Sequence, residues 1–334
     1  MVRIGQVDLG EFPLLLAPME DVSDPPFRAV CKENGADMLY TEFISVEGLI
    51  RDAEQSVQKL DIYPYERPIG IQIFGAKLDS MLAATDIVER AQPELLDINF
   101  GCPVKKVTCK GAGAGILKDL PKMQELAAEI VKRTDLPVTV KTRLGWDHDT
   151  IKIREVAHRL QDVGVQALSI HGRTRKQMYK GVANWDYIAE VKNDPGIHIP
   201  IFGNGDIDDP RKAQEYRDRY GVDGIMIGRG SIGYPWIFRE IKHYFATGEV
   251  LPPPSLEERV RTCKKHFAFS IEWKGPKRGI FEMRRHYGQY FKGLHGFKRF
   301  RMRLVQANDP DEVYHTLDEV QEYYTREEEA VFAV

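Results

Sequence analysis

Several features that narrow the class of a protein are scarce or missing in these 334 residues. There are only four cysteines, at Cys31, Cys102, Cys109 and Cys263, and no Cys/His spacing resembles a zinc or iron–sulfur site. We therefore expect a reduced protein without a metal. The apolar run at 14–17 is far below the roughly 20 residues that cross a bilayer, and the first residues lack a signal-peptide layout. These absences predict a cytoplasmic protein outside the membrane.

Net charge is also small. Lys and Arg number 47 against 50 Asp and Glu, a formal charge of −3, so a nucleic-acid site would have to come from local clustering of cations. No internal repeat or low-complexity tract is visible beyond a βα period. The chain has 43% hydrophobic residues, enough for a large core, and its length suits one α/β barrel plus a small second domain.

Eight short runs of β-forming residues recur along the chain. They cover residues 14–19, 38–43, 69–74, 95–100, 138–143, 167–171, 199–202 and 224–227. Segments with helical periodicity separate them, and this alternation predicts a parallel sheet. Polar or glycine-rich residues follow all eight runs, whereas a doubly wound open sheet gathers its site at one switch point. The sequence therefore favours an α/β fold of the (β/α)8 TIM-barrel class over the open sheet.

The pattern changes at three consecutive prolines, residues 252–254, which form a stiff linker. Ser255 and Glu258 follow with the spacing of a capping box, so a helix should begin there. Apolar residues then recur at helical spacing along most of the remaining chain, which predicts about four helices. We expect a catalytic barrel domain over residues 1–250 and an all-α helical bundle over residues 251–334.

Glycine-rich turns follow the last two predicted strands, with GNGD at 203–206 and IGRG at 227–230. In barrels this pair of loops often binds a phosphate through backbone N–H groups, and Arg229 would add positive charge. The alternative is that the glycines serve chain geometry alone.

Gln72, Lys141 and His171 end three other predicted strands, so their side chains can converge over the barrel mouth. A flavin needs such a set, with an amide at its pyrimidine edge and a cation near N1 and O2. The alternative is that these three side chains are exposed to solvent or hydrogen-bonded within the protein and bind no cofactor. Beside two phosphate-type loops, the set favours a flavin site.

Asn99 and Cys102 lie at the tip of the fourth predicted strand, in the sequence NFGCP. A thiol with a pKa near 8.5 is mostly protonated at pH 7, so Cys102 can act as a general acid. Packing is the usual role of a buried cysteine and is our expectation for Cys31 and Cys263. The role of Cys109 stays open.

The segment 274–303 has ten basic residues and one acidic residue, Glu282, a local charge of +9. Aromatic residues are interleaved with the cations, as expected for contact with RNA. A solvated charged face is the alternative reading. The cations are Lys274, Lys277, Arg278, Arg284, Arg285, Lys292, Lys298, Arg299, Arg301 and Arg303.

Seven motifs stand out along the predicted barrel. They are LAPMEDVSDPPFR at 16–28, IQIFG at 71–75, DINFGCPVKKV at 97–107, VKTRLGW at 140–146, HGRTRKQMYKG at 171–181, GNGDI at 203–207 and IGRGSIGYPWIF at 227–238. Together they closely resemble the tRNA-dihydrouridine synthase family. The stretch RRHYGQYFKGLHGFKRFR at 284–301 is similar to the helical domain of its bacterial B-type branch.

The resemblance implies an enzyme that uses FMN to reduce uridine to 5,6-dihydrouridine in tRNA, with NADPH or NADH as the reductant. Hydride would pass from flavin N5 to uracil C6 of a flipped-out uridine. Cys102, the cysteine of the GCP motif, would then donate a proton to C5, and Asn99 would lie near the base. The implied FMN contacts are Pro18, Met19, Glu20, Gln72, Lys141, His171, Asn204, Gly205, Asp206, Gly228 and Arg229.

Binding of tRNA is expected to use two groups of cations. At the barrel mouth these are Arg143, Arg173 and Arg175. In the helical bundle they are Arg284, Arg285, Lys292 and Arg299. No membrane, metal or obligate protein partner is expected.

Two departures from the family pattern are visible. Glu20 stands where many members have alanine, and KGAGAGIL at 110–117 is richer in glycine than usual. Two other function classes stay open: an FMN oxidoreductase of free pyrimidines or dihydroorotate, which would not need the basic bundle, and an RNA-binding protein that retains an inactive barrel. The sequence leaves open which uridine is modified and the oligomeric state.

Overall fold

A computed structural model describes residues 1–332, with side chains through residue 326. Eight parallel strands follow the chain in order around a barrel. They are β3 (Leu14–Leu16), β4 (Leu39–Tyr40), β6 (Ile69–Phe74), β7 (Leu95–Phe100), β8 (Val138–Arg143), β9 (Ala167–His171), β10 (Ile201–Asn204) and β11 (Gly224–Ile227). β11 returns to pair with β3, and a parallel bridge between Leu15 and Met38 closes the ring. The predicted TIM-barrel class is therefore confirmed.

Five strands have the predicted bounds, and three differ. β3 ends at Leu16 because the chain then turns, with Met19 N–H donating to Ser23 Oγ over 2.8 Å. β4 is limited to Leu39–Tyr40, and the short β5 (Ile44–Ser45) continues the pairing with β6. β10 begins after Pro200, which has no N–H for the ladder, and extends to Asn204.

Helices surround the barrel. They are α1 (Pro25–Glu33), α2 (Val46–Leu49), α3 (Glu54–Gln58), α4 (Leu78–Arg90), α5 (Lys105–Thr108), α6 (Leu120–Arg133), α7 (Ile153–Asp162), α8 (Asp186–Lys192), α9 (Pro210–Tyr220) and α10 (Ile237–Thr247). Local sequence explains several starts. Asp24 caps α1 and Asp209 caps α9, each followed by proline in the first turn, and Gly221 ends α9 at φ +62°.

An N-terminal hairpin was not predicted. β1 (Arg3–Ile4) and β2 (Val7–Asp8) are antiparallel, and each is too short to give a period-two signal. Ile4 is fully buried in one cluster with Leu15, Leu95 and Phe202 of the barrel interior. The hairpin thus covers the amino end of the barrel, opposite the end where function is expected.

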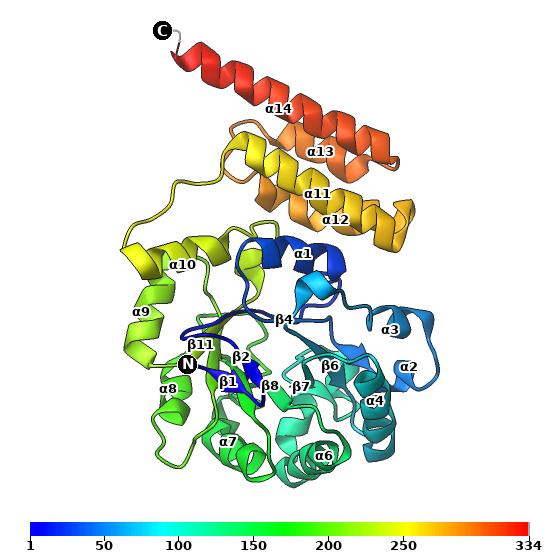
Figure 1. Ribbon diagram of the computed structural model, residues 1–334, viewed down its shortest axis with the longest axis vertical. Helices are drawn as coiled ribbons and strands as arrows, with labels where there is room; N and C mark the ends of the chain where they lie inside the picture. The colour runs from blue at the N-terminus through cyan, green and yellow to red at the C-terminus, as the bar shows by residue number, and fades with distance from the viewer. Residues whose placement is uncertain (333–334) are drawn as a thin grey trace.

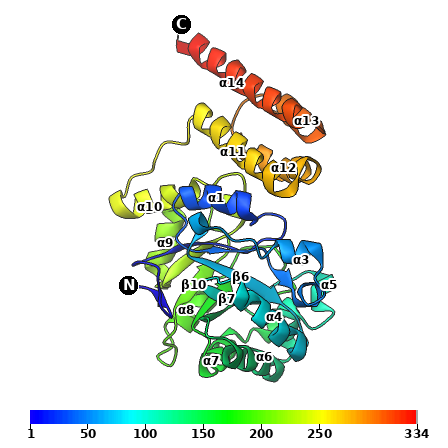
Figure 2. The ribbon, with the colours of Figure 1, turned by 45° about the vertical axis from the view of Figure 1, so that its right-hand side comes forward.

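The predicted four-helix region follows the proline linker. It consists of α11 (Leu256–Lys274), α12 (Pro276–Tyr290), α13 (Lys298–Gln306) and α14 (Pro310–Phe332). Ser255 caps α11 as predicted, by accepting a hydrogen bond from Glu258 N–H, whereas the Glu258 carboxylate pairs with Arg239 of α10. Figures 1 and 2 both show this bundle stacked on α1, one of the helices that surround the barrel. In the described chain no helix has the length and hydropathy required for a membrane span.

Candidate active site

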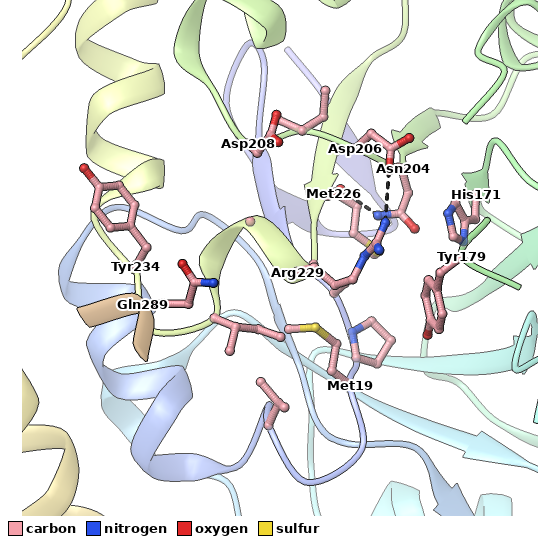
Figure 3. Close-up of a pocket in the computed structure, with 18 of the residues that line it drawn as sticks. Met19, His171, Tyr179, Asn204, Asp206, Asp208, Met226, Arg229, Tyr234 and Gln289 are labelled. Atoms are coloured by element: carbon pink, nitrogen blue, oxygen red, sulfur yellow. Dashed lines mark hydrogen bonds and ion pairs between the residues drawn. The ribbon is translucent and has the colours of Figure 1, made fainter. Parts of the chain in front are cut away.

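A cavity of about 1340 Å³ opens at the carboxyl ends of the barrel strands. Loops after six strands line its inner part, and the 250–253 linker and the end of α12 line its outer part. In the close-up of Figure 3, Asn204 and His171 face this space from the ends of β10 and β9, and Met19, Arg229 and Tyr179 face it from the segments that follow strands. Active sites of TIM barrels lie at this end. The cavity is therefore the candidate active site.

Most of the predicted site residues meet at this cavity. Those that line it are Pro18, Met19, Glu20, Asn99, Cys102, Lys141, Arg143, His171, Arg173, Asn204, Gly205, Asp206, Gly228, Arg229 and Lys292. Five predicted residues do not line it: Gln72, Arg175, Arg284, Arg285 and Arg299.

The two glycine-rich turns lie side by side at one end of the cavity. Gly205 has φ +126°, and a Cβ on Gly230 would lie 2.3 Å from the carbonyl oxygen of Ile207, so both glycines are required by chain geometry. Within the described chain, the backbone N–H groups of Gly205, Asp206 and Arg229 donate no hydrogen bond. These N–H groups are available to an anion, which is what a bound phosphate group requires.

Asp206 orients two arginines at these turns. Its carboxylate accepts from Arg173 Nη2 at 2.7 Å and from Arg229 Nη2 at 3.0 Å, and also from Ala183 N–H. Burial opposes ionisation of Asp206, but the hydrogen bonds from Arg173 and Ala183 lower its pKa on balance. The backbone N–H of Asp206 is therefore available to an anion, while its side chain holds the half-exposed Arg229 in place.

Lys141 and His171 form the floor of the cavity. Lys141 Nζ donates to Asn204 Oδ1 over 3.2 Å, and burial lowers the pKa of Lys141 to about 8, so the ammonium stays mostly charged at pH 7. Burial and the cations Arg143 and Lys141 hold the pKa of His171 well below its usual range. The floor thus offers one cation and one neutral imidazole, and the imidazole can donate or accept a hydrogen bond.

Cys102 is held at the cavity by Asn99. Asn99 Oδ1 accepts from Cys102 N–H at 2.8 Å and from Gly101 N–H at 3.0 Å. Asn99 Nδ2 donates to Gln72 Oε1, and Gln72 Nε2 donates to Asp97. Burial raises the pKa of the Cys102 thiol, so it is protonated at neutral pH. Cys102 therefore has the protonation state of a general acid.

Gln72, which was predicted to contact FMN, is not among the residues that line the cavity. Its side chain is fully buried, and its amide donates to Asp97 and accepts from Asn99. Glu20 lines the cavity rim, where Lys59 Nζ donates to its carboxylate over 2.7 Å. The same ammonium lies 3.5 Å from Glu42, so the described carboxylate cluster of Glu20, Asp21 and Glu42 already contains a cation.

The contacts of Arg143 and Arg173 do not fit the predicted guiding of tRNA phosphates. Both side chains are almost fully buried. Arg143 donates to the carbonyls of Gly101, Thr174 and Met178, which ties the loops after β7 and β9 together. Arg173 is paired with Asp206. Sequence spacing placed both arginines correctly at strand ends but gave no sign of their acceptors.

Sequence reasoning also missed Tyr179. Its side chain lines the cavity and is 52% exposed, with Arg229 Cζ 4.8 Å from the ring centroid. The available signal was an aromatic residue inside the motif after β9. An exposed ring beside a cation suits stacking on a nucleobase.

The cations of the bundle fall into two groups. Lys274 is buried between Asp24 and Glu282, Arg303 pairs with Glu319, and Arg284 donates to the carbonyl of Ala307. Arg285, Lys292 and Arg299 are exposed, although Arg285 also donates to the carbonyl of Asp21 over 2.7 Å. Arg299 lies over the ring of Tyr323 and Lys292 lies at the cavity rim. The surface available to RNA is therefore less positive than the local charge of +9 suggests.

Fold and cavity together define a TIM-barrel enzyme. Solved structures with this fold include a morphinone reductase N189A mutant in complex with tetrahydroNAD, with TM-score 0.53 and 10% identity over 77% of this chain and 92% of that chain. Another is histamine dehydrogenase from Rhizobium sp. 4-9, with TM-score 0.55 and 11% identity over 78% of this chain and 50% of that chain. At these identities the likeness shows the fold alone.

The family model for dihydrouridine synthase (Dus) matches residues 15–327. A tRNA-dihydrouridine synthase B of Pseudomonas putida is 40% identical over 92% of this chain and 90% of its own. A probable tRNA-dihydrouridine synthase 1 of Synechocystis is 39% identical over 95% of this chain and 88% of its own. The chain belongs to the dihydrouridine synthase family, and the predicted resemblance to its bacterial B-type branch is confirmed. It is accordingly a flavin-dependent oxidoreductase.

Proposed function

We propose that this enzyme reduces uridine to 5,6-dihydrouridine in tRNA, with FMN in the barrel-mouth cavity and NADPH or NADH as the reductant. The observation that carries the proposal is the convergence of a protonated thiol, a buried cation and free backbone N–H groups on one cavity. The barrel is then the catalytic part, and the bundle after residue 250 is the part that binds tRNA. The proposal places the enzyme in the cytoplasm with its substrate, without a metal or an obligate protein partner.

The residues present fit FMN. The N–H groups of Gly205, Asp206 and Arg229 suit its phosphate, and Lys141 suits its N1 and O2 edge because a cation there stabilises the charge of the reduced ring. Pro18, Met19 and Glu20 would contribute the wall beside it. When bound, FMN supplies the hydride that uracil C6 receives.

Residues of the chain donate the proton to uracil and orient the thiol that carries it. Asn99 fixes the backbone of the Cys102 loop, which directs the thiol toward the cavity. Cys102 donates its proton to uracil C5 as negative charge develops there. Tyr179 offers a stacking surface at the mouth for the nucleotide that enters.

The first test is cofactor uptake followed by turnover on tRNA. The purified chain should bind FMN, show the absorption of an oxidised flavin, and form dihydrouridine in tRNA that is detected by nucleoside mass spectrometry. Lys141→Met should make the bound flavin harder to reduce, because the cation at the floor is lost. The matched control is Lys132→Met on the exposed face of α6. A folded chain that takes up no FMN would contradict the proposal and favour an inactive RNA-binding barrel.

Binding of tRNA should depend on the exposed cations of the bundle and on salt. Each lost phosphate contact should flatten the plot of log affinity against log salt by about 0.7–0.9. We expect the triple variant Arg285→Ala, Lys292→Ala, Arg299→Ala to weaken binding and flatten this slope. Lys122→Ala is the control, because α6 lies on the opposite side of the barrel from the bundle (Figures 1 and 2). An unchanged slope in the triple variant would place the RNA surface elsewhere.

A further inference from the structure

Arg175, which was predicted to guide tRNA phosphates, is instead engaged with the loop that bears Cys102. Its Nη2 donates to Thr108 Oγ1 over 3.2 Å, and Thr108 is the last residue of α5. Its Nε is buried and has no hydrogen-bond partner within the described chain. Arg175 is half-buried, and these contacts turn the Nε and Nη2 edge of its guanidinium toward the protein.

Trp146 packs against the guanidinium of Arg175. Arg175 Cζ lies 4.7 Å from the Trp146 ring centroid, and Lys118 Nζ lies 3.7 Å from it. Two backbone bonds align the loops that carry these side chains: Arg175 N–H donates to Gly145 O, and Lys176 N–H donates to Trp146 O, both at 2.9 Å. Both cations are attracted to the ring face of Trp146.

The glycine-rich segment holds the same loop from the other side. Ala114 N–H donates to the carbonyl of Cys102 over 3.0 Å. A Cβ on Gly113 would lie 2.8 Å from that carbonyl, and a Cβ on Gly115 would lie 2.5 Å from the carbonyl of Thr108. Close packing under the Cys102 loop therefore explains Gly113 and Gly115, whereas Gly111 has a φ of +76°, which favours glycine.

We propose that Arg175 and Trp146 are positioning residues that hold α5, and with it Cys102, in the arrangement that proton donation requires. This inference rests on the proposed function of Cys102. We call the contacts of Arg175 with Trp146 and Thr108 the brace. The brace needs the guanidinium of arginine, because lysine keeps the charge but cannot lie over the Trp146 ring while it donates to Thr108. Arg175→Lys therefore separates geometry from charge.

The test uses the enzyme loaded with FMN and compares Arg175→Lys and Trp146→Leu with the control Lys176→Gln. Lys176 is the next residue and pairs with Asp147, outside the brace. Each variant is treated with iodoacetamide, and alkylation of Cys102 is measured by mass spectrometry against Cys109, which is exposed already. Loosening the brace should increase alkylation of Cys102 several-fold relative to Cys109 and leave the control unchanged.

The second readout is single-turnover reaction with tRNA. Arg175→Lys should slow it by about 10- to 100-fold, as expected for a misplaced reacting group, with affinity for tRNA and its salt slope unchanged. Unchanged alkylation together with weaker tRNA binding would overturn the inference and return Arg175 to a phosphate contact. Lower thermal stability with normal alkylation and rate would also overturn it. If the wild type forms no dihydrouridine, the proposed function fails, while the alkylation ratio still tests the brace.

Discussion

Cys102→Ala should slow the reduction of uridine in tRNA by about 10²–10⁴, the usual loss when a general acid is removed. Binding of FMN, affinity for tRNA and reduction by the nicotinamide should stay close to wild type, because none of these steps uses the thiol. The measurement is reoxidation of the pre-reduced enzyme by tRNA in a single turnover. A wild-type rate in this variant would remove Cys102 from the mechanism.

Cys109→Ala is the matched control for this experiment. Cys109 is exposed at the end of α5, and it does not line the cavity. Cys109→Ala should therefore leave the single-turnover rate with tRNA nearly unchanged. If Cys102 were only a packing residue, Cys102→Ala would lower stability, and turnover would follow the folded fraction.

The pH profile offers an independent check on the same thiol. An acid works only while it is protonated, and burial raises the pKa of Cys102. The rate should therefore stay high through the pH range in which an ordinary cysteine loses its proton, near 8.5, and fall only above it. The profile is also measured in Lys141→Met, because burial lowers the pKa of Lys141 to about 8 and its charge is lost in the same range. A fall below pH 8 that persists in this variant would indicate a different acid.

Local sequence determined the barrel well. The buried runs of β6 to β9 give a strong signal because both faces of a parallel strand are covered, and their bounds were predicted correctly. The N-terminal hairpin gave no such signal, since its strands have two residues each. It is stabilised by barrel residues that are distant in the sequence.

For the candidate active site, the sequence predicted which residues lie together but not their hydrogen-bond partners. The ends of parallel strands meet at one edge of the barrel, so Lys141, His171 and Asn204 could be placed together from order alone. Hydrogen-bond partners could not be assigned in this way. Arg173 pairs with Asp206 of the next strand, and Gln72 is used below the cavity by Asp97. A polar residue at a strand end can face the substrate or support its neighbour, and only the three-dimensional contacts separate the two.

The same limit affects the basic segment of the bundle, where Lys274 is buried and binds no nucleic acid. Its ammonium pairs with Asp24, which caps α1 of the barrel, and with Glu282 of α12. Asp24 is 250 residues away in the chain, so no sequence pattern links the two groups. The ion pair joins the barrel to the bundle at the contact between α1 and α11.

Lys274→Met should lower the free energy of unfolding by about 3–5 kcal/mol, because it leaves the buried Asp24 carboxylate without its cation, while Glu282 keeps only its pair with Arg278. Burial opposes the charge of Lys274, but the two carboxylates raise its pKa on balance. A raised lysine pKa stabilises the fold at all pH values below the ordinary lysine pKa near 10.4, and this contribution is lost only as pH rises through the folded value. The loss in Lys274→Met should therefore be constant between pH 6 and 9, which urea unfolding can measure.

Lys277→Met is the matched control, since Lys277 is exposed three residues further along and has no ion pair among the described residues. It should change stability by no more than about 0.5 kcal/mol. Adding Asp24→Asn to Lys274→Met should recover part of the loss, because it removes the carboxylate charge that Lys274→Met leaves unpaired. Equal stability of Lys274→Met and Lys277→Met would show that the buried ion pair contributes nothing to the docking of the bundle. In that case the packing of Phe27 against His266 and His286, with ring centroids 5.5 and 5.1 Å apart, would have to hold the two parts together.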